Sequence, residues 1–201
     1  MSIVISGSTG INTVSENIIT SIAEEVTIAA LPQMFNAVST EVGNIVTGRV
    51  LQVVSTLTSA QTSQSITTTD TQLGGLTHTI TPKGNNSKFL VTVRWFGEVG
   101  SGWETYFNIH QDGVRVNSAG GISIGLYMPT LTYQNDNSST PEMANFSTLV
   151  NTSSTIGTPI TYTAVVGGIS TRTLWNNRTF STPTSNFESG TSEIIIMEVA
   201  A

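Results

Sequence analysis

Few residues of this 201-residue chain carry the groups that enzymes use for chemistry. The sequence has no cysteine, which excludes thiolate catalysis and zinc sites built on thiolates. Its two histidines, His78 and His110, have no second histidine or carboxylate at metal-ligand spacing. His78 alternates with apolar residues and is expected to be partly buried and hydrogen-bonded, whereas His110 precedes a turn and is expected at the surface. We therefore predict no metal site, no cofactor and no catalytic residue.

Two carboxylates, Glu98 and Glu104, flank the glycine-rich stretch GEVGSGWE. Glycosidases place two carboxyl groups on either side of the scissile bond, so a catalytic pair is one interpretation. The simpler interpretation is that both are solvated loop carboxylates at the end of a hairpin. The sequence contains no nucleophile elbow, phosphate loop or dinucleotide fingerprint. We therefore predict that the protein is not an enzyme.

Residues 127–142 form the longest stretch without regular hydrophobic spacing, and they mix aromatic rings with amide and carboxylate groups. Sugar rings stack their C–H faces on aromatic side chains, and their hydroxyls need hydrogen-bonding partners. The alternative is an ordinary polar loop. Trp103 and Trp175 also lie near turns, where a ring is either a lid on the core or a contact surface. The candidate ligand-binding residues are Tyr127, Tyr133, Asn135, Asp136 and Trp103.

Charge and hydropathy restrict the partners of the protein. Charged residues make up 10% of the chain and the net charge is −6, with seven lysines and arginines scattered singly. Nucleic-acid binding requires a basic surface, so we predict no nucleic-acid partner. No apolar run approaches the roughly 18 residues of a membrane span, and the first residues lack the pattern of a signal peptide. We expect synthesis in the cytosol and no membrane insertion.

Most of the chain has the composition and spacing of β-strands. The sequence contains 33 threonines and 24 serines, and threonine is β-branched and fits a pleated strand. From Gly48 onward, turn residues punctuate apolar runs about every ten residues, which predicts an antiparallel, jelly-roll-like β-sandwich head over 48–201. Asp112-Gly113 predicts a two-residue hairpin turn. The expected strands are 49–57, 64–69, 75–81, 88–97, 104–110, 114–117, 121–127, 144–150, 159–166, 171–175 and 193–199.

Two of the expected strands are apolar on both faces, namely Lys88–Trp95 and Glu193–Val199. Such strands are covered on both sides, either by a second sheet or by another subunit. The run Ile194–Met197 would be an aggregation hazard if exposed, so the final strand is expected to be central in its sheet.

The first fifth of the chain has helical spacing instead. Residues 1–12 hold a short apolar run closed by glycines and are predicted to be a strand or an extended arm. Residues 13–47 begin with a capping-box pattern and carry apolar residues three and four apart, which predicts a helical segment. These helices either pack on their own domain or join copies of the chain. Their second half has the spacing of a coiled-coil seam, which is formed by Leu31, Phe35, Val38, Val42 and Ile45.

Three segments, in order along the chain, carry a family resemblance. They are Gly48–Val54 (GRVLQVV), Ile80–Val91 (ITPKGNNSKFLV) and Ile194–Ala201 (IIIMEVAA). They resemble the C-terminal β domain of fibre proteins of tailed bacteriophages, which commonly read GKVLQVV, then ITPSSxxSKVLV, and end near MEIA. The resemblance implies a trimeric head, a trimerisation stem over 13–47 and an arm that attaches to other virion proteins. The long shaft of such fibres is missing, and a short helical segment stands in its place.

The resemblance also implies a function at the surface of a virion. We predict a short tail fibre or spike whose trimeric head contacts a bacterial surface glycan or other envelope component during adsorption. The alternative is a capsid decoration or cement protein that stabilises the particle without binding a receptor.

Overall fold

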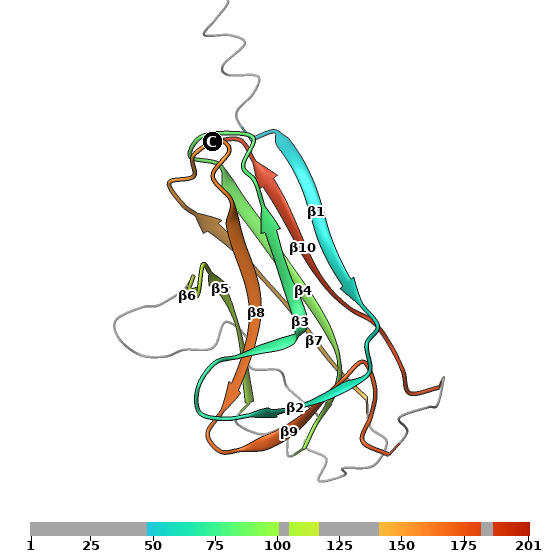
Figure 1. The fold of residues 1–201 in the computed structure, drawn as a ribbon. Coiled ribbons are helices and arrows are strands. Elements are labelled where there is room, and N and C mark those ends of the chain that lie inside the picture. The colour runs from blue at the N-terminus through green and yellow to red at the C-terminus, as the bar shows by residue number, and fades with distance from the viewer. Residues whose placement is uncertain (1–47, 101–104, 117–140, 182–186) are drawn as a thin grey trace, which may run out of the picture. The chain divides into compact units, whose positions relative to one another are not determined.

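The structure is a computed structural model that describes residues 48–100, 105–116, 141–181 and 187–201 (Figure 1). These residues form a mainly β fold of ten strands. Within these ranges no helix is long and apolar enough to cross a membrane. The predicted arm and helical stem, residues 1–47, lie outside the described part of the chain.

The observed strands follow the expected ones closely. The expected strand at 121–127 lies outside the described residues, and β2 is shifted towards the N-terminus relative to its predicted range. The hairpin turn is confirmed, since Asp112 and Gly113 join β5 to β6 with φ angles of 49° and 84°. The strands are β1 (Val50–Thr58), β2 (Thr62–Ile66), β3 (Thr71–Ile80), β4 (Lys88–Val99), β5 (Thr105–Gln111), β6 (Val114–Arg115), β7 (Glu142–Asn151), β8 (Ile160–Gly168), β9 (Arg172–Asn176) and β10 (Ser192–Val199).

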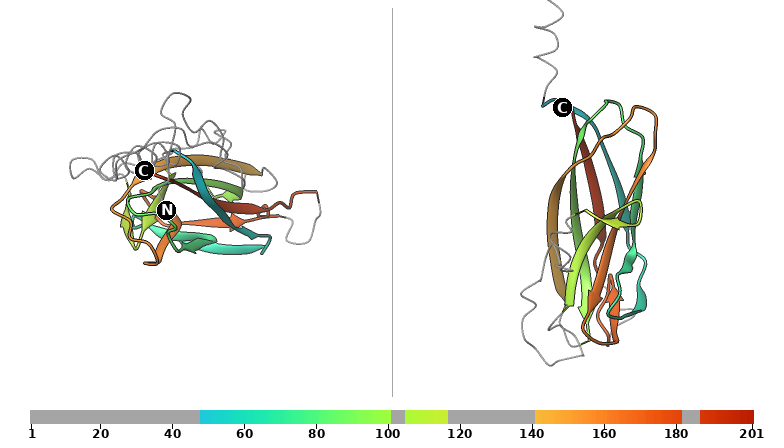
Figure 2. Two further views of the ribbon diagram at one scale, coloured as in Figure 1. Left: turned by 90° about the horizontal axis from the view of Figure 1, so that it is seen from above. Right: turned by 90° about the vertical axis from the view of Figure 1, so that its left-hand side faces the viewer.

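The strands form two antiparallel sheets, which Figure 2 shows as two layers. In the first sheet β10 lies between β1 and β4, and β7 pairs with the other edge of β4. The last three residues of β4 pair with β9, which carries β2 on its far side. The second sheet has the order β3-β8-β5-β6. The predicted central position of the final strand is confirmed, because β10 pairs with β1 and with β4.

One hydrophobic core joins the two sheets. Alternate residues of a strand face opposite sides, so every second side chain of β4 and of β10 points inward. The ring centroids of Trp95 in β4 and Phe107 in β5 are 5.4 Å apart, and those of Phe89 in β4 and Tyr162 in β8 are 5.8 Å apart. These contacts connect one sheet to the other. The outward side chains of β10 remain only partly buried among the described residues.

The chain enters and leaves the domain at the same end. The Gly48 amide donates a hydrogen bond to the Ala200 carbonyl at 3.0 Å, and the Ala200 amide donates to the Arg49 carbonyl at 2.8 Å. Figure 1 shows the C-terminus beside the start of β1. The turn between β3 and β4 also lies here, because its following residue, Lys88, pairs with Val199.

The carboxylate of Glu198, in β10, binds this turn. Its oxygens accept hydrogen bonds from the Lys83 and Gly84 amides at 2.9 Å, the Ser87 hydroxyl at 2.7 Å and the Gln52 side-chain amide at 2.6 Å. Glu198 itself is fully buried. Burial by itself would raise the pKa of Glu198, but the hydrogen bonds outweigh it and hold the pKa below its ordinary value. The carboxylate is therefore ionised and satisfied inside the protein.

Glu198→Ala should lower the free energy of unfolding by about 3 kcal/mol, because it leaves buried donors without an acceptor. The matched control is Glu193→Ala on the outward side of the same strand, where the carboxylate lies 3.9 Å from Arg94. An exposed pair of this kind contributes less than about 1 kcal/mol. Urea denaturation near neutral pH measures both variants, and equal losses would contradict a special role for Glu198.

Candidate functional site

The described domain has two ends that lie far apart along its strands. Gly48, where residues 1–47 join the domain, lies at one of them. The first residue of β4, Lys88, pairs with Val199, and its last residue, Val99, pairs with Leu174 of β9. Eleven residue steps of about 3.4 Å separate these two pairs by roughly 37 Å. We call the end that holds β2 and β9 the distal end, and it lies opposite the C-terminus in Figure 1.

An aromatic pair lies at the distal end. The rings of Trp175 in β9 and Phe180 pack edge to face, with centroids 4.9 Å apart. Phe180 is 51% exposed, and Trp175 is half-buried. A Cβ atom on Gly100 would lie 3.3 Å from the Trp175 ring, so the glycine lets the ring lie close to the backbone. Partly exposed rings of this kind offer a stacking surface for the apolar face of a ligand.

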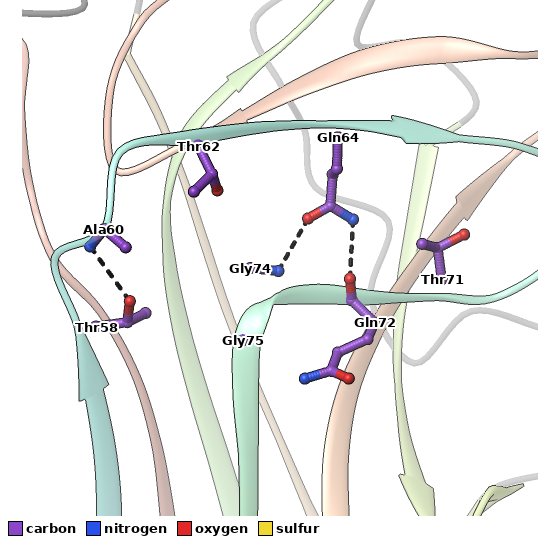
Figure 3. Close-up of a pocket in the computed structure, with 8 residues that line it drawn as sticks. All are labelled: Thr58, Ala60, Thr62, Gln64, Thr71, Gln72, Gly74 and Gly75. Atoms are coloured by element: carbon purple, nitrogen blue, oxygen red, sulfur yellow. Dashed lines mark hydrogen bonds between the residues drawn. The ribbon is translucent and has the colours of Figure 1, made fainter.

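An uncharged pocket lies on the other side of the β2–β9 pair. Ser63 is opposite Trp175 and Gln64 is opposite Leu174, so Gln64 and Trp175 face opposite sides. The pocket on the Gln64 side is shallow and has a volume of about 430 Å³. Its lining contains no charged side chain, and most of the surface that it presents is apolar (Figure 3). The lining residues are Thr58, Ala60, Thr62, Gln64, Thr71, Gln72, Gly74 and Gly75.

Gln64 connects the pocket wall to the core. Its Oε1 accepts hydrogen bonds from the Gly74 amide at 3.0 Å and from Asn176 Nδ2 at 2.8 Å. Its Nε2 donates to the Gln72 carbonyl at 2.8 Å, as Figure 3 shows. Asn176 in turn accepts a hydrogen bond from Trp95 Nε1 at 2.9 Å. These hydrogen bonds run from the buried Trp95 and Asn176 to the half-buried Gln64 and position the pocket relative to the sheets.

Two glycines shape the same wall. Gly74 and Gly75 have φ angles of 48° and 78°, and the pairing of β3 with β8 shifts register around them. A Cβ atom on Gly74 would lie 2.6 Å from Asn176 Oδ1. Glycine is therefore required at Gly74 both by the left-handed backbone and by the close approach.

Two carboxylates, Glu98 and Glu142, also lie near the distal end. Glu98 is buried in β4 and accepts a hydrogen bond from the Phe180 amide, so the prediction of a solvated loop carboxylate is wrong. Glu142 accepts a hydrogen bond from the Val99 amide at 3.0 Å. Burial, reinforced by the charge of Glu98, raises the pKa of Glu142 to about 7 despite that hydrogen bond. Glu104 lies outside the described residues.

The expectation that His110 lies at the surface is also wrong. His110 Nε2 lies 2.6 Å from Asp70 Oδ2, and Asp70 also accepts hydrogen bonds from Tyr106 at 2.9 Å and from Arg115. Burial would raise the pKa of Asp70, but the hydrogen bonds from Arg115, His110 and Tyr106 keep it below its ordinary value. This cluster ties the turn before β3 to β5 and β6. His78 is partly buried and lies 2.9 Å from Thr56 Oγ1, as expected.

The residues predicted to bind the receptor lie outside the described residues, and so do those of the predicted seam. The chain on either side of Trp103 is described, however, and so are Pro141 and Glu142, the last two residues of the predicted loop. Glu142 pairs with Gly97 near the end of β4, so the end of the loop lies at the distal end. The two sets are Tyr127, Tyr133, Asn135, Asp136 and Trp103 for the receptor, and Leu31, Phe35, Val38, Val42 and Ile45 for the seam.

The sequence patterns do not indicate Phe180 or the uncharged pocket. Asn176-Asn177 is the one sequence signal near Phe180, because asparagine tolerates the positive φ angle of a turn, and Asn177 has a φ of 59°. Among the described residues no three His, Asp or Glu side chains gather as metal ligands would. No protein-family model and no curated protein sequence matches this chain.

Glu142→Gln should change the pH dependence of stability. The pKa of Glu142 is about 7 in the folded protein against 4.5 for an ordinary glutamate, so the folded state holds this proton more tightly. The contribution of Glu142 to stability should therefore fall as pH rises from about 4.5 to about 7, and then stay constant. Gln removes the charge and keeps an oxygen acceptor for Val99, so the variant should be more stable than the wild type above about pH 7.

Thermal unfolding of both proteins between about pH 4 and pH 8 measures this difference. Glu193→Gln, on the outward side of β10, is the matched control for removal of one negative charge. A constant difference in melting temperature between Glu142→Gln and the wild type across this range would contradict the raised pKa.

Proposed function

We propose that this protein is a bacteriophage virion protein, a short tail fibre or spike whose head contacts the host surface during adsorption. The observation that carries the proposal is the polarity of the described domain. Residues 1–47 join it at Gly48, beside the C-terminus, and the partly exposed Trp175–Phe180 pair lies at the distal end. A fibre needs this arrangement, because only the end away from the particle reaches a cell.

The strand order supports a jelly-roll β-sandwich as the head. Leaving out β2 and β9, the eight other strands form one sheet in the chain order first-eighth-third-sixth and one in the order second-seventh-fourth-fifth. This is the order of two Greek keys in an eight-stranded jelly roll, an architecture of viral and carbohydrate-binding proteins. In this proposal β2 and β9 are an added pair at the distal end. Fold alone does not define function, so the site residues carry the rest of the argument.

The three segments that resemble bacteriophage fibre proteins meet in space. Gln52 belongs to the first segment, Ser87 to the second and Glu198 to the third, and the Glu198 carboxylate accepts hydrogen bonds from both other side chains. Each of the three is also a residue of the corresponding fibre motif. The three motif residues therefore form one hydrogen-bonded cluster, which supports a head fold shared with those fibre proteins. It does not point to a shared receptor.

The chemistry of the distal end supports a hydroxyl-rich ligand, such as a bacterial surface glycan. The Trp175–Phe180 pair offers a face for stacking, and the neighbouring uncharged pocket is lined by threonine and glutamine residues. Tyr127, Tyr133, Asn135, Asp136 and Trp103 remain part of the proposed receptor surface, since Thr105 after Trp103 and Glu142 at the end of the predicted loop lie at the same end.

In this proposal residues 13–47 form the trimerisation stem through the seam residues Leu31, Phe35, Val38, Val42 and Ile45. Residues 1–12 attach the stem to other virion proteins. Three weak receptor sites per trimer, and several trimers per particle, raise the strength of attachment through effective concentration.

Phe180→Ala should reduce binding of the full-length protein to host cells at least tenfold without changing its melting temperature, because Phe180 is half-exposed. Tyr133→Ala combined with Asn135→Ala should act in the same direction. Val114→Ala, which trims an exposed apolar side chain in β6 near the hairpin turn, is the matched control and should bind normally. Binding of labelled protein to cells, quantified with a melting curve for each variant, gives both readouts.

Normal binding by both sets of variants would remove these residues from the receptor surface. A wild-type protein that binds neither cells nor envelope extract would contradict the fibre function. Imaging of particles that then showed on the order of hundreds of copies over the shell would establish the capsid decoration function in its place.

A further inference from the structure

The outer face of the first sheet carries an apolar row that crosses four strands. Val53 in β1 pairs with Met197 in β10, Met197 pairs with Leu90 in β4, and Leu90 pairs with Leu149 in β7. Directly opposed residues in a sheet point to the same face, so these four side chains are neighbours. Val53 and Leu149 are 54% and 51% exposed, and Met197 and Leu90 are half-buried.

Further apolar side chains extend this row along the strands. Val50 pairs with Val199 on the side towards Gly48, and Ile195 lies two residues from Met197 on the side towards the distal end. Polar and charged residues share this face on either side of the row. Ile195 pairs with Ser55 and Thr92, Val199 pairs with Lys88, and Leu57 pairs with Glu193, whose carboxylate lies 3.9 Å from Arg94. We call this surface the outer apolar band, and it consists of Val50, Val53, Leu57, Leu90, Leu149, Ile195, Met197 and Val199.

We propose that the outer apolar band is the surface on which copies of this chain pack against one another, with each band facing a shared axis. This inference rests on the proposed trimer and assigns its contact within the head. Residues 1–47 enter the domain two residues before Val50, at the margin of the band. Ile45, the last residue of the predicted seam, is five residues from Val50, so the chain between them spans at most about 17 Å.

If copies meet along the seam, Val50 of each copy, at the margin of the band, lies within about 17 Å of Ile45. No other class of partner is subject to this constraint, which favours a second copy of the chain as the occupant. An apolar sheet face next to an axis also gains by burial, because apolar surface removed from water stabilises association.

The size of the band fits a contact that works together with the stem. Four strands about 4.8 Å apart and six residue steps of about 3.4 Å along β10 define a face of roughly 400 Å². A stable specific interface buries about 800 Å² on each partner. The band therefore supplies about half of the surface that a firm complex needs, and the seam has to supply the rest.

Single introduced thiols test this surface, because the natural chain contains no cysteine. Leu149→Cys and Val53→Cys place a thiol on the band, and Val114→Cys and Ile169→Cys place one on exposed apolar positions elsewhere, which are 69% and 62% exposed. In full-length protein at a concentration where it sediments as a trimer, thiols on the band should react with a maleimide at least tenfold more slowly than the control thiols. Dilution below the dissociation constant should abolish the difference.

A charged pair provides a second test that does not depend on labelling. Val53→Glu combined with Leu149→Glu should raise the dissociation constant of the full-length trimer at least tenfold, because it buries two like charges at the axis in every copy. Both positions are half-exposed in the single chain, so the circular dichroism spectrum should stay native. Val114→Glu combined with Ile169→Glu is the matched control and should assemble as the wild type does.

The outcomes separate this inference from the proposed function. Equal labelling of all four thiols in a trimeric protein overturns the band as the contact and leaves the trimer and host binding intact. Slow labelling of the band in a protein that sediments as a monomer shows that the chain's own residues cover the band, and it overturns packing between copies. A wild type that binds host cells as a monomer contradicts the proposed trimer while keeping adsorption.

Discussion

The buried carboxylate of Glu198 is the interaction on which the rest of the described domain depends. An ionised carboxylate away from water is tolerated only when hydrogen-bond donors surround it. Here the donors are the Gln52 side chain in β1 and, in the turn between β3 and β4, the Lys83 amide and the Ser87 hydroxyl. Turning Glu198 inward also sets the register of β10. Because side chains alternate, Ile194 and Ile196 must then enter the core, and Ile195 and Met197 must face outward. A register shift by one residue would expose Ile194 and Ile196 and would turn Ile195 and Met197 into the core instead.

This register gives β10 two apolar faces with different roles. The inner face of the first sheet packs against the second sheet through ring contacts such as that between Trp95 and Phe107. The outer face of the first sheet keeps Val53 and Leu149 half-exposed among the described residues. A strand as apolar as β10 is an aggregation hazard unless its neighbours and its faces are covered. Pairing with β1 and β4 protects its edges, and the proposed packing between copies would protect its outer face.

The two ends of the domain differ in the same physical terms. Backbone hydrogen bonds and the Glu198 carboxylate hold the end at Gly48 together, where the upstream residues join. At the distal end, hydrogen bonds between the side chains of Trp95 and Asn176 and of Asn176 and Gln64 connect the core to the uncharged pocket. Rigid elements that support short loops are the usual setting for a binding surface. The same end also contains Glu142, and burial raises the pKa of this carboxyl group to about 7 because it disfavours the charged form.

The sequence by itself determined the strands, because their signals are local. A run that is apolar on both faces indicated β10 and its central place, and Asp112-Gly113 indicated a hairpin turn that needs positive φ angles. Contacts between remote residues left no such signal. His110 meets Asp70 from 40 positions away, and Glu98 is buried because its strand passes beneath the Phe180 backbone. Only the tertiary structure decided the contact of His110 and the burial of Glu98. It also decided which face of β10 enters the core, because the two faces of this strand are equally apolar in the sequence.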